Sequence, residues 1–183
     1  MTTIDDRLAP RELAYCGLFG AAALLLPTLF HLLQLGRALM PMYLPLMILP
    51  FFVRPLPAAT TAGLTPLLSA AVTGMPPWYP PVAVLMALEL ATMALLLALL
   101  VRRWPSAHPA ALLLPVLVLG RLLHVALVYG CARLIALPAG FLAGLSWLSG
   151  WPGILLMAIV VPTVVRIARA TARPAGPLAR GEA

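Results

Sequence analysis

The chain has 183 residues, of which 63% are hydrophobic and only 9% are charged. A soluble domain is about 45–50% apolar and about 25% charged. This composition excludes a soluble monomer, a disordered chain and a nucleic-acid-binding domain, in spite of a net charge of +7. It indicates an integral membrane protein, and the length allows about six spans because each needs about 20 residues.

The first half of the chain contains three apolar runs. The run at residues 13–35 includes Pro27, which membrane helices tolerate, and no cleavage site follows it, so we expect a retained helix. The runs at residues 43–53 and 58–73 are short, and they predict either tilted helices or a re-entrant pair.

A proline-rich loop separates the two halves of the chain. The sequence Gly74-Met75-Pro76-Pro77-Trp78-Tyr79 cannot form regular helix. Apolar runs follow at residues 82–101, 110–137 and 146–167. The sequence therefore predicts an all-α polytopic membrane protein with six transmembrane helices. Residues 1–11 form an N-terminal segment, residues 12–170 the membrane domain, and residues 171–183 a disordered tail.

The arginines predict the orientation in the plasma membrane. Six spans place both termini on one side. That side then holds nine arginines against two on the other, which is a strong positive-inside bias. Both termini are therefore expected to be cytoplasmic, with the Met75–Pro81 loop facing outward.

The sequence contains no constellation that predicts an enzyme. None of its serines lies in a Gly-x-Ser-x-Gly elbow, its three histidines are far apart, and it has no phosphate-binding glycine loop. We therefore expect no catalytic activity, no metal and no cofactor.

Three ionisable residues interrupt the apolar spans: Glu89, Arg121 and His124. A charge at mid-bilayer costs about 2.5–3.5 kcal/mol, and such residues face the bundle interior and pair. Arg121 and His124 share one helix face because they are three residues apart. One interpretation is a structural Glu89–Arg121 ion pair. The other is that one or more of the three residues line a ligand cavity.

Polar and aromatic residues also mark the predicted outer ends of the spans. His31 and Gln34 end the first span, where they are either solvated or part of an outward-facing site. Trp78 and Tyr79 are either interfacial anchors or a lid over a pocket.

The first span also carries small residues at a spacing of four, Gly17 and Ala21. Small residues at this spacing let helices approach closely. They indicate either a contact within the bundle or a surface that docks onto a partner membrane protein.

Several segments together resemble the S components, the substrate-binding membrane subunits of energy-coupling factor (ECF) vitamin transporters. The segments that carry the resemblance are Leu25-Leu26-Pro27-Thr28-Leu29-Phe30-His31, Leu39-Met40-Pro41-Met42-Tyr43-Leu44-Pro45, Thr65-Pro66-Leu67-Leu68-Ser69 with Thr73-Gly74-Met75-Pro76-Pro77, Met86-Ala87-Leu88-Glu89-Leu90-Ala91, Gly120-Arg121 and Gly150-Trp151-Pro152-Gly153-Ile154. Tyr43 stands where the family usually has His, and Arg54-Pro55 replaces a glycine-bearing turn.

The resemblance implies a six-helix subunit that binds a vitamin with high affinity from outside. It also implies docking onto a transmembrane coupling subunit driven by two ATPases, with Gly17 and Ala21 on the docking face. The implied cavity or lid residues are His31, Gln34, Met42, Tyr43, Met75, Trp78, Glu89, Arg121 and His124.

Within the family, the pattern is most similar to members assigned to cobalamin precursors such as α-ribazole or dimethylbenzimidazole, followed by pantothenate-type members. An aromatic mouth of Tyr43, Trp78 and Tyr79 would stack a flat ring, whereas a carboxylate ligand would favour Arg37 or Arg121 as its clamp. Two alternatives stay open: a solitary carrier that works without ATPases, and a membrane enzyme or assembly factor without a pocket.

Overall fold

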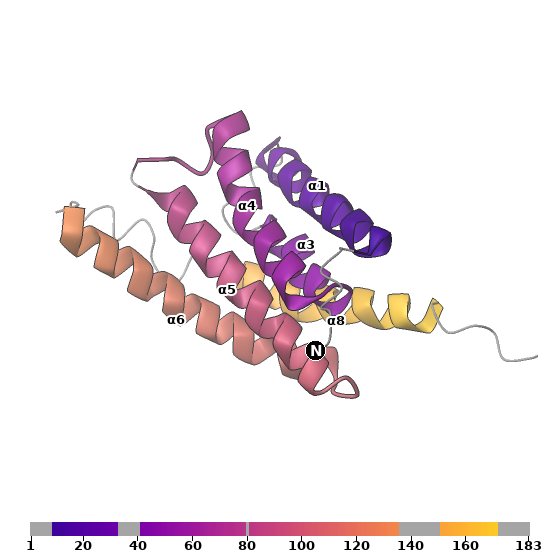
Figure 1. Cartoon of the computed structure of the whole chain (residues 1–183). Helices are drawn as coiled ribbons and strands as arrows, with labels where there is room; N and C mark the ends of the chain where they lie inside the picture. The colour runs from indigo at the N-terminus through magenta and orange to yellow at the C-terminus, as the bar shows by residue number, and fades with distance from the viewer. Residues whose placement is uncertain (1–8, 33–40, 80, 136–150, 172–183) are drawn as a thin grey trace, which may run out of the picture.

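In this computed structural model, residues 9–32, 41–79, 81–135 and 151–171 are described, and all their regular secondary structure is helical. The elements are α1 (Pro10–Leu32), α3 (Tyr43–Ile48), the 3-10 helix η1 (Leu49–Phe51), α4 (Pro55–Thr73), α5 (Val82–Arg103), α6 (Pro109–Ile135) and α8 (Trp151–Thr171) (Figure 1). Each of the six predicted runs contains a helix, and the all-α class is confirmed. The predicted tail, residues 171–183, falls almost entirely outside the described residues.

Four helical segments have the length and hydropathy that a bilayer crossing needs: Pro10–Phe30, Val82–Arg103, Pro109–Leu134 and Pro152–Thr171. They make the chain compatible with an α-helical, multi-pass membrane protein. The second predicted run differs from the others because α3 and η1 together cover only Tyr43–Phe51. It is a short helical element.

Local sequence signals explain where the central helices begin and end. Pro55 occupies the first position of α4, where its missing N–H costs nothing, and Arg54 before it is extended. Gly74 ends α4 in the left-handed region with φ 73°. Arg102 and Arg103 lie in the last turn of α5, where positive charge favours the helix dipole.

Four helices pack in a row, and α8 and α3 cover one side of it. α4 contacts both α1 and α5, and α5 contacts α6, so these four helices lie side by side (Figure 1). α8 packs against α6 and α3, while α3 also contacts α1, α4 and α5. The short α3 is therefore enclosed by longer helices.

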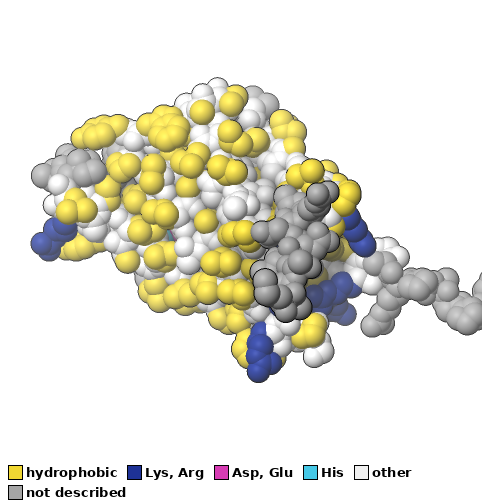
Figure 2. All heavy atoms as spheres, viewed as in Figure 1, with side chains coloured by type: hydrophobic (Ala, Val, Ile, Leu, Met, Phe, Trp, Pro, Cys, Tyr) yellow, Lys and Arg dark blue, Asp and Glu magenta, His cyan; other side chains and the backbone are white. Residues whose placement is uncertain are grey.

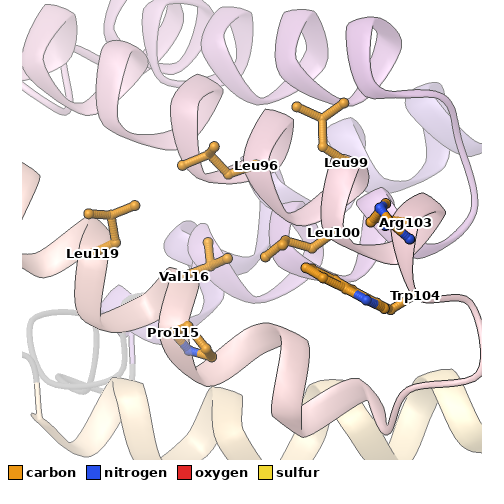
Figure 3. A pocket seen from close by; sticks show the side chains of 8 residues that line it. All are labelled: Leu96, Leu99, Leu100, Arg103, Trp104, Pro115, Val116 and Leu119. Atoms are coloured by element: carbon orange, nitrogen blue, oxygen red, sulfur yellow. The ribbon is translucent and has the colours of Figure 1, made fainter.

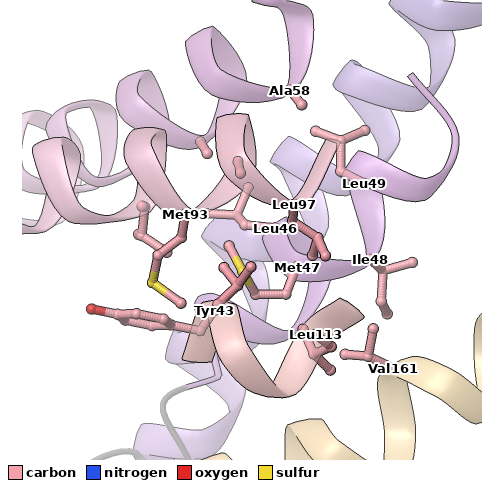
Figure 4. Close-up of a cluster of buried hydrophobic side chains, with 14 of the residues drawn as sticks. Tyr43, Leu46, Met47, Ile48, Leu49, Ala58, Met93, Leu97, Leu113 and Val161 are labelled. Atoms are coloured by element: carbon pink, nitrogen blue, oxygen red, sulfur yellow. The ribbon is translucent and has the colours of Figure 1, made fainter. Parts of the chain in front are cut away.

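The core centres on α3. Leu46, Met47 and Leu49 have no exposed surface, and they meet Leu97 of α5 and Val161 of α8 (Figure 4). In lipid, packing drives the association of such apolar helices. The surface is also apolar: in the view of Figure 2, hydrophobic side chains are spread over the whole face and the coloured charged side chains are arginines at its margins.

Two glycines allow the central helices to approach closely. A Cβ at Gly63 of α4 would lie 3.3 Å from Cβ of Ala91 on α5. A Cβ at Gly120 of α6 would overlap the Met93 side chain of α5. Gly120 and Met93 therefore face each other one turn beyond Glu89 on α5 and directly before Arg121 on α6.

An ion pair joins the first turn of α1 to the start of α4. Glu12 Oε2 lies 2.8 Å from Arg54 Nε, and Glu12 Oε1 accepts the Arg54 backbone N–H at 2.8 Å. The guanidinium of Arg169 on α8 lies over the Phe51 ring, 5.9 Å from its centroid. We call this part of the molecule, defined by Glu12, Arg54 and Arg169, the basic end.

Candidate functional site

Glu89 is the one acidic side chain that the described residues bury deeply. It lies seven residues after Val82, the start of α5, or about 10 Å along the helix at 1.5 Å per residue. Only 3% of its surface is exposed. A carboxylate at this depth needs polar partners because an unpaired charge in an apolar interior is costly.

Two side chains from two other helices reach the same oxygen of Glu89. The Tyr43 hydroxyl on α3 donates a hydrogen bond to Glu89 Oε2 at 2.9 Å. His124 Nδ1 on α6 lies 2.7 Å from that oxygen, in an ion pair when the imidazole is protonated. We call Tyr43, Glu89 and His124 the Glu89 cluster.

Arg121 lies one turn before His124 on α6 and is partly buried. Its positive charge is near enough to Tyr43 to act on it electrostatically. Arg121 is not without a partner in the structure. The sequence predicted Arg121 as the partner of Glu89, and that pairing stays a prediction. On α6, His124 is the residue whose side chain lies 2.7 Å from Glu89 Oε2.

The backbone explains why these three helices meet at one atom. Tyr43 is held in place because α3 is buried among longer helices, and the residue is only 6% exposed. Figure 4 shows its ring beside Met93, with the hydroxyl pointing away from the aliphatic core. Gly120 leaves room on α6 for the Met93 side chain, and His124 one turn further along reaches Glu89.

Two members of the Glu89 cluster, Tyr43 and His124, can change their hydrogen-bonding roles while staying in place. A phenol and an imidazole can each donate or accept, whereas an arginine only donates. A ligand carrying an N–H or O–H group could therefore bind the carboxylate while Tyr43 and His124 readjust. Among the described residues, no buried side-chain N or O atom lacks a hydrogen-bond partner, so the cluster is also satisfied as it stands.

The proline loop after α4 is held by two side chains of that helix. Ser69 Oγ donates to the Met75 carbonyl at 2.7 Å, and Met75 N–H donates to Thr73 Oγ1 at 3.2 Å. Ser69 is 5% exposed. The structure therefore gives Thr73 and Ser69, two residues of the resemblance motif, a definite role in shaping the loop.

The predicted aromatic mouth is divided between two environments. Trp78 and Tyr79 are 52% and 74% exposed, and Met75 is 62% exposed. Tyr43, by contrast, is buried against Glu89. The expectation that Tyr43 joins Trp78 and Tyr79 in one aromatic mouth stays a prediction, and the Tyr43 hydroxyl is engaged with the Glu89 carboxylate.

The other predicted residues have mixed positions. Met42, directly before α3, is buried with 6% exposure. His31 falls in the last turn of α1, but its side chain lies outside the described part of the chain, as do Gln34 and Arg37 entirely. Those three predictions stay predictions.

Gly17 and Ala21 lie on the exposed side of α1, and a Cβ at Gly17 would meet nothing within 4 Å. α1 is also the least buried of the four candidate spans. The structure thus places both residues facing out of the bundle, where a partner could reach them.

A pocket of about 410 Å³ lies away from the Glu89 cluster, between α5 and α6 (Figure 3). It contains none of the predicted site residues, and sequence reasoning missed it. Arg103-Trp104 at the end of an apolar helix is the signal that could have indicated it.

Among the described residues, no group of three His, Cys, Asp or Glu side chains could hold a metal ion.

Sequence reasoning also missed the Glu12–Arg54 pair. An acid in the first helical turn, together with an arginine directly before a helix-starting proline, was the available signal.

Comparisons with known proteins found no matching family model, curated protein or solved structure.

Proposed function

We propose that this protein is the substrate-binding membrane subunit of an ECF-type vitamin importer, with the Glu89 cluster at the base of its binding site. One observation carries the proposal. Three residues singled out by the sequence, Tyr43, Glu89 and His124, meet at a single buried oxygen although they come from three different helices. Ionisable side chains retained inside a bilayer are costly and usually serve function.

The cluster favours one class of vitamin over another. A ligand N–H or O–H can donate to the Glu89 carboxylate, and a flat ring can stack on an aromatic side chain. A carboxylate ligand would be repelled by Glu89 and would depend on Arg121 for compensation. We therefore place a cobalamin precursor such as dimethylbenzimidazole or α-ribazole first, and pantothenate second.

Binding to the purified protein tests this proposal. A vitamin panel that includes these three compounds should yield a ligand whose affinity falls at least about ten-fold in Glu89→Gln, because a charge-assisted hydrogen bond is lost. Tyr43→Phe, which removes the hydroxyl that binds Glu89, should also lower the affinity. Tyr79→Phe on the exposed loop is its control and should leave the affinity unchanged. A folded wild-type protein that retains no small molecule would overturn the proposal, and so would equal binding by wild type and Glu89→Gln.

The cluster is self-satisfied, and this observation favours a second candidate: a structural polar cluster in a membrane protein without a ligand pocket. On that account, Glu89→Gln lowers thermal stability with no ligand effect. The binding experiment above, read alongside the melting temperature of each variant, separates the two candidates.

The proposed orientation has six crossings and cytoplasmic termini. The basic end supports it, since arginines favour the cytoplasmic side. Membrane-impermeant maleimide tests it on variants without Cys16 and Cys131. Tyr79→Cys should be labelled in intact cells, and Ser106→Cys only after permeabilisation. The reverse pattern would place the basic end outside.

We further propose that the exposed side of α1 docks onto the coupling subunit of the importer. Gly17→Leu should abolish vitamin uptake in cells while leaving ligand binding by the purified protein unchanged. Gly130→Leu is the matched control, because a Cβ there also meets nothing within 4 Å. Equal uptake by both variants would contradict this docking face and favour a carrier that works alone.

A further inference from the structure

The groove between α5 and α6 has a shape that follows the two helices. On α5 its wall is formed by Leu96, Leu99, Leu100 and Arg103, which lie along one helix face (Figure 3). From Leu96 to Arg103 it extends about 10 Å along the axis, at 1.5 Å per residue. It begins about one turn beyond the place where Gly120 faces the Met93 side chain.

The chemistry of the groove changes along its length. Its walls are aliphatic, with Val116 of α6 as a buried floor at 2% exposure. At one end are Arg103 and Trp104, and the guanidinium lies 5.6 Å from the centroid of the indole ring. Figure 3 shows both side chains beside Leu100 at that end of the groove. Arg102 adds a second positive charge in the same turn.

We propose that this groove is a binding site for an anionic phospholipid. One acyl chain lies along the aliphatic wall and the phosphate pairs with Arg103. Basic pockets between membrane helices recognise anionic headgroups, and an arginine binds phosphate through several N–H donors at once. The ring of Trp104 orients the guanidinium at the depth where tryptophan prefers the membrane interface. The groove opens on the outside of the bundle, so a lipid reaches it directly from the bilayer.

Charge complementarity separates this occupant from the vitamin of the proposed function. The walls offer no polar side chain except at the Arg103 end, so a small polar ligand would find few partners. A lipid has the same division, with a hydrocarbon chain and an anionic head. The lipid site therefore stands independently of the Glu89 cluster.

Native mass spectrometry of the full-length protein tests the proposal. The probes are phosphatidylglycerol and phosphatidylcholine with identical acyl chains. We expect preferential retention of phosphatidylglycerol, and about a five-fold loss of that retention in Arg103→Gln, because a basic residue near the lipid headgroup contributes on that scale. Arg166→Gln, an exposed arginine of α8 outside the groove, should leave retention unchanged.

A second pair of variants tests the groove itself. Leu119→Trp should fill the groove and displace the lipid, whereas Leu122→Trp, similarly exposed on α6 but outside the groove, should not. Equal retention of both lipids would overturn the proposal, as would equal effects within either pair of variants. A photo-crosslinker at position 119 should capture lipid in native membranes, and capture of a protein would instead assign the groove to a docking partner.

Discussion

Glu12 and Glu89 are two carboxylates in similar helices with opposite settings. Glu12 is held by Arg54, a permanent cation whose side chain is 33% exposed, and by a backbone N–H at a helix start. Glu89 is held by a phenol and an imidazole, with its own side chain 4% exposed. The comparison teaches that a permanently charged partner near the surface fastens a helix end, whereas the interior carboxylate is held by two groups that can each donate or accept a hydrogen bond.

The largest effect should follow removal of the buried carboxylate. Glu89→Ala leaves Tyr43 and His124 without their shared acceptor, and breaking such a buried pair costs about 3–5 kcal/mol in soluble proteins. Unfolding of the detergent-solubilised protein by added SDS measures the free energy. A loss no larger than that of Glu12→Ala would break the contrast between the two carboxylates.

A smaller effect is expected where α5 and α6 approach. Gly120→Ala introduces a Cβ that overlaps Met93, which should cost about 1–3 kcal/mol and move His124 from Glu89. In a Met93→Ala background, Gly120→Ala should cost less than it does in wild type, because the overlapping atoms are absent. Gly130→Ala is the control. If Gly120→Ala were as stable as Gly130→Ala, the contact would not position the cluster.

The Glu12–Arg54 pair should contribute about 1 kcal/mol, because a hydrogen bond to a charged group is discounted by its partial exposure. Glu12→Gln should therefore lower the free energy of unfolding slightly and leave ligand affinity unchanged. Titration with the vitamin that binds wild type measures the second quantity. An affinity loss as large as that of Glu89→Gln would show that the basic end also governs binding.

The smallest effect concerns the proline loop. Ser69→Ala removes the hydrogen bond to the Met75 carbonyl, which is worth about 1 kcal/mol or less. Faster proteolysis between residues 74 and 79 should reveal a loosened loop. Ser106→Ala, an exposed serine in the α5–α6 turn, should leave the cleavage rate unchanged. Equal rates in the two variants would remove Ser69 from the account of the loop.

Much of the fold could be predicted because its boundaries carry strong signals. Pro55 starts α4, Gly74 ends it, and Arg102 with Arg103 closes α5, all close to the predicted limits. The short α3 also begins at the predicted residue, Tyr43. Whether it counts as a membrane crossing could not be read from its residues, since it is shorter than a span.

The site was harder to predict because every helix face is apolar. In such helices hydrophobic periodicity does not show which face points inward. The facing of His124 toward Glu89 is a matter of packing between α5 and α6, where Gly120 leaves room for the Met93 side chain. Tyr43 was predicted as a site residue, but its bond to Glu89 spans 46 positions and left no local pattern.

The central claim is that the Glu89 cluster binds the ligand, and an experimental structure with the panel's best-binding vitamin tests it most directly. We predict a ligand N–H or O–H within hydrogen-bond distance, about 3 Å, of the Glu89 carboxylate. A ligand bound elsewhere, with no atom in contact with Glu89, would contradict the claim and leave the cluster a structural feature.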